Sequence, residues 1–273
     1  MKNRLVLIVG AVVLLAGIGI ALGARSKGQG TRENPQTTAS VNQLLEEAAK
    51  AEAQGDRLKA KAAYASIVDE YPDYDKVEEI QDKLGQLNVS IIASNAQTSQ
   101  TLVYEVKPGD SLGKLAKNYS TTKELIKKSN NLKSDVIRVG QRLRIWNAPF
   151  NIFVDKSQNI LILKSGEEVI KIYNVSTGSN NSTPVGSYKI ASKIEKPVWF
   201  KAGSAPIPAE SPANELGSRW MGFDLDPHYG IHGTIRPEQI GQQVTSGCVR
   251  LRNEEVEELF DIVPMGTTVV IQD

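Results

Sequence analysis

The sequence predicts a multidomain chain. We expect an N-terminal transmembrane helix, a small α-helical hairpin region, a βααβ module and a mainly-β, β-sandwich-like C-terminal domain. Three observations predict this order: an uncharged apolar run over residues 5–23, helical periodicity over residues 41–90, and short alternating strands with glycine and proline turns after residue 150. At 273 residues, the chain is long enough for two or three domains.

The first segment, residues 1–24, is typical of a membrane anchor. Its apolar run approaches the roughly 20 residues that a membrane helix needs and exceeds the usual signal-peptide core of about 7–15 residues. Lys2 and Arg4 precede the run, so the positive-inside rule predicts an extracytoplasmic or periplasmic chain tethered to the inner membrane. Cleavage after Gly23, which would secrete the protein, is the alternative, because small residues precede that bond.

Residues 25–40 are polar and are expected to form a flexible tether to the helical region at 41–90. Two apolar stripes with helical spacing flank a break at residues 54–56, and residues 71–73 end the second stripe. The pattern resembles one tetratricopeptide-type hairpin, with residues 75–87 as a third, capping helix. Repeat arrays need about three repeats, and only one is present here. The region is therefore expected to be either a module that docks a protein partner or a helical spacer or dimerising stalk.

A second linker is expected over residues 91–101, followed by a strand–helix–helix–strand module over residues 102–146. Pro108 and Gly109 turn the chain after the first strand, and Ser111 is a good helix N-cap. The formal net charge is +1 and no basic run is interleaved with aromatic residues, so nucleic-acid binding is not indicated.

This module resembles LysM, a small glycan-binding fold. By that resemblance, a groove lies between the Gly109–Leu112 loop and the Asn130–Leu132 loop, and backbone amides of these two loops bind the N-acetyl groups of peptidoglycan glycan strands. The implied glycan-binding residues are Gly109, Asp110, Ser111, Leu112 and Asn130.

The last segment, residues 150–273, alternates as short strands and contains one amphipathic helix. Asn253 is expected to cap that helix, and Val256, Leu259 and Phe260 are expected to face the core. One helix among many strands predicts the sandwich-like arrangement.

Cys248 is the only cysteine of the chain, so it cannot form an intramolecular disulfide. It follows Thr245, Ser246 and Gly247, and His232 lies sixteen positions upstream in a glycine-flanked turn. An imidazole that takes the proton of a thiol makes it a good nucleophile, and small neighbours leave backbone N–H groups free to hold an oxyanion. The alternative, a buried structural cysteine, fits these polar and glycine-rich flanks less well.

These motifs, together with the Thr183-Pro184-Val185-Gly186 turn, resemble the YkuD-type L,D-transpeptidase catalytic domain over roughly residues 150–272. The resemblance implies that Cys248 is the nucleophile, that His232 is the general base and later the acid, and that the Gly233 carbonyl orients the imidazole. Many family members carry histidine where this chain has Ser246.

Further residues are implied in substrate and oxyanion binding. Backbone groups around Gly247 would hold the oxyanion. Arg250 would bind a substrate carboxylate or, alternatively, form a structural ion pair. Trp199 and Trp220 would wall the substrate site or, alternatively, pack in the core. The set is completed by Thr245 and Ser246, which flank the nucleophile.

The implied function is a peptidoglycan L,D-transpeptidase that releases D-alanine and forms 3→3 crosslinks through a cysteine thioester. L,D-carboxypeptidase activity, attachment of a protein to peptidoglycan, and a non-catalytic wall-anchoring scaffold are the alternatives. The expected partners are glycan strands and stem peptides, the membrane through residues 5–23, and a protein at residues 41–90. No cofactor or metal is expected: Pro227 and Gly230 disfavour a helical zinc motif around His228 and His232.

Overall fold

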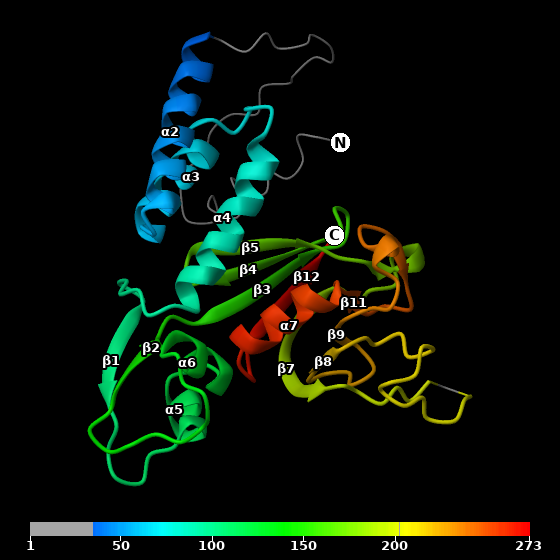
Figure 1. Ribbon diagram of the computed structural model, residues 1–273. Helices are drawn as coiled ribbons and strands as arrows, with labels where there is room; N and C mark the ends of the chain where they lie inside the picture. The colour runs from blue at the N-terminus through cyan, green and yellow to red at the C-terminus, as the bar shows by residue number, and fades with distance from the viewer. Residues whose placement is uncertain (1–34, 202) are drawn as a thin grey trace. The chain divides into compact units, whose positions relative to one another are not determined.

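The computed structural model describes residues 35–201 and 203–273 (Figure 1). These residues divide into two compact units, one ending at Ile91 and one spanning Ile92–Asp273. The predicted membrane span at residues 5–23 lies outside the described residues. Among the residues that are described, no helix is both long enough and apolar enough to cross a membrane.

The first unit consists of three helices: α2 (Pro35–Ala53), α3 (Arg57–Glu70) and α4 (Val77–Ile92). Asp56 caps α3 by accepting a hydrogen bond from the Lys59 amide at 3.0 Å. Helices α2 and α3 pack together, and small side chains on them, such as Ala48 and Ala60, are fully buried.

Both linkers around this unit are shorter than predicted. Residues 35–40 of the expected tether are helical, because Pro35 is well suited to the first position of a helix. At the other end, α4 continues through Ile91 and Ile92, which extend its apolar stripe and are almost completely buried.

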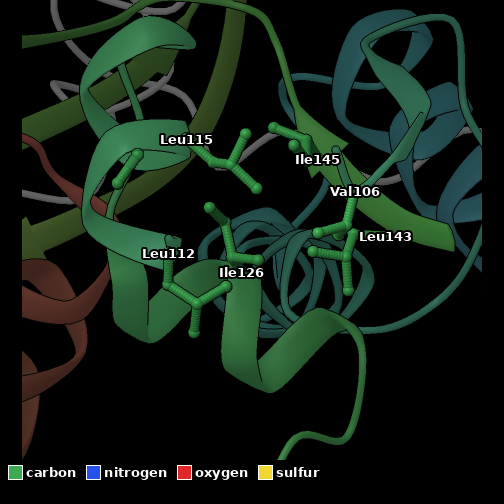
Figure 2. Close-up of a cluster of buried hydrophobic side chains, with 7 residues drawn as sticks. Val106, Leu112, Leu115, Ile126, Leu143 and Ile145 are labelled. Carbon is green, nitrogen blue, oxygen red and sulfur yellow. The ribbon is translucent and has the colours of Figure 1, made fainter. Parts of the chain in front are cut away.

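The second unit begins with the βααβ module, which confirms the predicted element order. Strands β1 (Thr101–Glu105) and β2 (Arg142–Trp146) pair antiparallel, and α5 (Leu112–Asn118) and α6 (Lys123–Ser129) lie between them in sequence. Ser111 and Thr122 cap the two helices by accepting from Lys114 and Leu125 amides. Figure 2 shows the small core that these elements enclose, made of Val106, Leu112, Leu115, Ala116, Ile126, Leu143 and Ile145.

The C-terminal domain is built on one eight-stranded sheet with the order β11-β9-β8-β7-β12-β3-β4-β5. The strands and the helix have these bounds: β3 (Phe150–Asp155), β4 (Ile160–Ser165), β5 (Glu168–Asn174), β7 (Gly186–Glu195), β8 (Arg219–Phe223), β9 (Gly230–His232), β11 (Val249–Arg250), α7 (Asn253–Ile262) and β12 (Thr268–Gln272). A short parallel ribbon joins β6 (Thr177–Gly178) and β10 (Gln243–Thr245).

The expected sandwich of two sheets is therefore replaced by one continuous, curled sheet. The reason lies in β7, which is ten residues long. Its first half, Gly186–Lys189, pairs with β12, and its second half, from Ile190 onward, pairs with β8. Because one strand serves two partners, the two halves of the sheet remain joined (Figure 1).

Helix α7 packs against β8 and β9. Its apolar face, which includes Val256, Leu259 and Phe260, is buried as the sequence predicts. Asn253 is not the N-cap, however. Arg252 occupies that position and its amide donates to the Glu255 carboxylate at 3.2 Å, while Asn253 is the first helical residue.

Candidate active site

The pairing of β9 with β11 brings the predicted nucleophile and base together. The strands are parallel, with Val249 opposite Ile231 and Arg250 opposite His232. Side chains alternate along a strand, so Arg250 and His232 share one face of the sheet. Cys248, two residues before Arg250, belongs to that same face, while Val249 and Ile231 are fully buried on the other.

Cys248 is partly exposed, and its thiol lies at the start of β11. Its Sγ atom is 3.5 Å from the carbonyl oxygen of His228. Burial raises the pKa of the thiol to about 11, although a hydrogen bond from the Gly230 backbone and the charge of Arg250 act in the opposite direction.

His232 is buried, and the sheet holds its ring on two sides. Its Nδ1 atom lies 2.7 Å from the carbonyl oxygen of Gly233. Because a carbonyl can only accept, Nδ1 carries the proton and Nε2 is left as the basic nitrogen. Trp220, the cross-strand partner of His232, stacks on the ring with centroids 5.8 Å apart and planes 24° apart.

Burial lowers the pKa of His232 to about 4, and the charge of Arg250 lowers it further. Hydrogen bonds to the carbonyls of Gly233 and Leu216 act in the opposite direction. At neutral pH, the imidazole and the thiol of Cys248 are therefore both uncharged in the resting protein. The ordinary pKa of an imidazole is about 6.5, and the exclusion of water by the sheet and Trp220 explains the difference.

Thr245 stabilises the turn before the predicted nucleophile. Its hydroxyl donates to the Cys248 carbonyl at 2.7 Å and accepts from the Gly247 amide at 3.1 Å. Gly247 has a φ of 126°, and a Cβ there would collide with Tyr229, so only glycine fits. The Gly247 amide is thus engaged within the turn, and Ser246 is exposed.

Arg250 is buried and forms an ion pair, which was the alternative to binding a substrate carboxylate. Its Nη1 donates to Gln239 at 2.9 Å, and its Nη2 lies 3.4 Å from the carboxylate of Glu215. Glu215 also pairs with Arg236 at 3.3 Å. The guanidinium therefore ties the nucleophile strand to the loop before β8.

Trp199 lies in the loop between β7 and β8 and is partly exposed. It forms two backbone hydrogen bonds with Ile207, both 2.9 Å long, and Lys201 lies over its ring. Asn214 is buried at the base of this loop and donates to the Pro197 carbonyl at 2.8 Å. The loop is thus held together by its own hydrogen bonds. Among the described residues, Trp220 stacks on His232, whereas Trp199 does not.

Sequence reasoning missed the role of Asn253. Its Oδ1 atom accepts from the amides of Ser218 and Thr234, each at 3.1 Å. The residue follows the nucleophile strand closely in sequence, which was the available signal, but its partners lie 19 and 35 residues away.

In the LysM-like module, the side chains of the predicted glycan contacts serve the module's own fold. Asp110 accepts from the Tyr104 hydroxyl and the Lys107 amide, both at 2.8 Å. Ser111 caps α5, and Leu112 is in the core.

Asn130 is used by the fold in the same way. It donates to the Arg144 carbonyl and accepts from the Arg144 amide, both at 2.7 Å. The backbone amides of the two loops, including that of Gly109, remain the predicted glycan contacts.

A hollow of about 500 Å³ lies beside the second of these loops. It is lined by Asn131 and Leu132, by lysines of α6 and by Asp261 of α7. Lys128 pairs with Asp261 at 2.7 Å, so the module and the catalytic domain meet at its edge.

Comparison with known proteins finds two matching family models and several similar proteins. The model of the YkuD L,D-transpeptidase catalytic domain matches residues 149–271, and the LysM domain model matches residues 104–146. "Putative L,D-transpeptidase YqjB" of Bacillus subtilis is 40% identical over 127 residues, which cover 45% of this chain and 70% of that protein. "Putative L,D-transpeptidase YkuD" of Bacillus licheniformis is 31% identical over 62% of this chain and 98% of its own length. The solved catalytic domain of the E. faecium L,D-transpeptidase is 22% identical over 46% of this chain and 98% of that one, with a TM-score of 0.37.

Proposed function

The chain belongs to the L,D-transpeptidase family, and we propose that Cys248 and His232 are the residues through which it forms 3→3 crosslinks in peptidoglycan. The enzyme is an acyltransferase. The parallel register of β9 and β11 carries the proposal, because it sets a thiol and an imidazole with a defined tautomer on one face of the sheet.

In the first half-reaction, the Cys248 sulfur attacks the carbonyl carbon between the third residue of a tetrapeptide stem and its terminal D-alanine. His232 Nε2 takes the thiol proton and delivers it to the nitrogen of the departing D-alanine. A thioester joins Cys248 to the shortened stem.

In the second half-reaction, the side-chain amine of the third residue of another stem attacks the thioester. His232 takes a proton from that amine and returns it to the sulfur as the new amide forms. The products are the 3→3 crosslink and the free thiol, so the protons balance over the cycle.

The resting charges fit a coupled proton transfer. The pKa of the thiol is raised and that of the imidazole is lowered, so a separated thiolate and imidazolium are disfavoured before substrate arrives. We infer that Nε2 removes the proton as the sulfur approaches the acyl carbon. The Cys248 amide is the better candidate for the oxyanion donor, since the Gly247 amide is bonded to Thr245.

The presence of both domains supports a cell wall-related protein outside the cytoplasm. Binding of the LysM module to glycan would raise the local concentration of stem peptides near Cys248. We further propose that residues 5–23 tether the chain to the membrane and that the helices in the 41–90 region dock a partner or act as a spacer.

The test uses a purified disaccharide-tetrapeptide as the sole substrate, with products identified by mass spectrometry. Release of D-alanine together with a 3→3 dimer is the expected result. Positioning the acceptor amine is worth up to about 7–11 kcal/mol relative to attack by solvent water, so the dimer is expected to exceed the hydrolysed tripeptide. Accumulation of tripeptide without dimer, even at high acceptor concentration, would replace this function with L,D-carboxypeptidase activity.

A further inference from the structure

Asn253 occupies an unusual place at the start of α7. It follows the nucleophile strand β11 by three residues and is half-buried. Its Oδ1 atom accepts two backbone hydrogen bonds of 3.1 Å, from Ser218 at the edge of β8 and from Thr234 just beyond β9. A single side-chain oxygen therefore joins the helix to the ends of two strands.

The surrounding backbone leaves room for this oxygen only because two neighbours are glycines. A Cβ atom at Gly217 or at Gly233 would collide with Asn253 Oδ1. Gly217 also adopts a φ of 65°, which disfavours any other residue. The two glycine-containing turns thus pack backbone to backbone around the asparagine side chain.

The decisive feature is the peptide unit between Gly233 and Thr234. Its N–H group donates to Asn253 Oδ1, and its carbonyl oxygen accepts from His232 Nδ1 at 2.7 Å. In a planar trans peptide these two groups point in opposite directions. A chain of hydrogen bonds therefore runs from Asn253 through one rigid peptide to the imidazole, and each bond polarises the next.

We propose that Asn253 is a positioning residue for the transpeptidation reaction, which holds the Gly233–Thr234 peptide in the plane that fixes the tautomer and orientation of His232. It acts through that peptide and touches neither the thiol nor the substrate. Because α7 follows the Cys248 strand directly, the same contact also sets the base relative to the nucleophile. The inference rests on the proposed function of His232.

The test compares two substitutions of one side chain. Asn253→Asp keeps an oxygen that accepts from both amides, whereas Asn253→Ala removes it. Glu255→Ala is the matched control, because it removes the carboxylate that accepts from the Arg252 amide in the same helical turn and leaves the 233–234 peptide untouched.

The first measurement uses ¹⁵N NMR to determine the tautomer of His232 in the resting protein. The chain has only two histidines, so a His228→Gln background leaves one signal. Wild type, Asn253→Asp and Glu255→Ala are expected to show the Nδ1–H form, and Asn253→Ala a mixture of both tautomers. In Asn253→Asp the new carboxylate is also expected to raise the pKa of His232 through the shared peptide.

The second measurement is the rate of acylation by a carbapenem. Asn253→Ala is expected to acylate about 10- to 100-fold more slowly, with a nearly unchanged carbapenem concentration for half-maximal rate. The acylation rate of Asn253→Asp is expected to stay within about threefold of wild type. A folded Asn253→Ala protein with the wild-type tautomer and rate would overturn the proposal.

If Asn253→Ala does not fold, Asn253→Asp decides: loss of the Nδ1–H form or an unshifted His232 pKa would overturn the proposal. Retention of that form with a raised pKa would support it. The NMR result is independent of catalysis. Failure of wild type to acylate would instead count against the proposed function.

Discussion

Asn130 in the LysM module and Asn253 in the catalytic domain are both asparagines at a helix end, but their side chains bond to backbone groups with different roles. Asn130 ends α6 and bonds to both backbone groups of Arg144 on β2, so it closes the module's own fold. Asn253 begins α7 and holds the peptide that bonds to His232. The role of each asparagine follows from which backbone groups its neighbours leave unpaired.

The contrast extends to the two sites as wholes. In the LysM module, the polar side chains predicted to meet glycan are bonded within the module, so the exposed backbone amides remain the predicted glycan contacts. In the catalytic domain, the thiol of Cys248 contacts the backbone of His228 and Gly230, and Nε2 of His232, which carries no proton, is the predicted general base. Single substitutions should therefore abolish function at the catalytic site but lower stability in the module.

The largest effect is expected for Cys248→Ser. A hydroxyl is far harder to deprotonate than a thiol, and an imidazole with a lowered pKa does not compensate, so acylation should fall by at least about 10³-fold. Intact-mass detection of the covalent adduct with a carbapenem measures this. A serine variant that forms the adduct in normal yield would mean that Cys248 is not the nucleophile.

Trp146→Ala tests whether the two regions are separate folding units. Trp146 ends β2 of the module, yet its Nε1 donates to Ser165 Oγ at 3.0 Å and its ring stacks on Phe150 of the catalytic sheet. Thr122 also bonds to the Asp261 carbonyl of α7. Loss of this buried ring should lower the free energy of unfolding by about 3–5 kcal/mol.

Differential scanning calorimetry should show the transitions of both regions shifting in Trp146→Ala. Val136→Ala is the control, since Val136 is 75% exposed and should change little. A shift confined to the LysM transition would show that the module folds independently, and its deletion would then leave the catalytic domain intact.

Much of this fold was predictable because the signals are local. The helical period gave the buried face of α7, and the turn and cap residues Gly109 and Ser111 gave the βααβ module. The continuity of the sheet was not predictable, because β7 divides its length between β12 and β8, and that choice depends on pairings distant in sequence.

The candidate site was predictable only in part. The motif predicted Cys248 and His232 as a catalytic pair, and the register of β9 and β11 places them on one face of the sheet. Their pKa directions depend on burial by Trp220 and the sheet, which no spacing reveals. Asn253 was mistaken for a helix cap because its partners are backbone amides of remote loops.

The buried imidazole predicts a pH dependence of stability. Burial lowers the folded-state pKa of His232 to about 4, from an ordinary value of 6.5. Between those values the unfolded chain binds a proton that the folded chain does not, so acidification favours unfolding. The contribution is fully present above about pH 6.5 and falls by up to about 3 kcal/mol as the pH approaches 4.

Denaturant unfolding at several pH values, compared between wild type and His232→Gln, isolates this contribution from that of the carboxylates. The difference in free energy of unfolding between the two proteins should change in favour of His232→Gln on acidification. A constant difference from pH 7 to pH 4 would show that the imidazole is solvated and titrates normally, so the catalytic site would resemble an exposed surface.

The smallest effect, and the sharpest test of the comparison, concerns Asn130→Ala. Removing the hydrogen bonds to Arg144 should lower the stability of the module by about 1–3 kcal/mol, since buried backbone groups lose their partners. Asn131→Gly is the control, because Asn131 is exposed, makes no such bonds to β2 and has a φ of 53° that glycine tolerates. Cosedimentation with purified sacculi, well below the melting temperature, should stay within about twofold of wild type for both variants, because the predicted glycan contacts are backbone amides. A folded Asn130→Ala protein that no longer sediments would show that this side chain contacts the glycan directly. Asn130 would then bind a ligand, whereas Asn253 binds the backbone of its own domain.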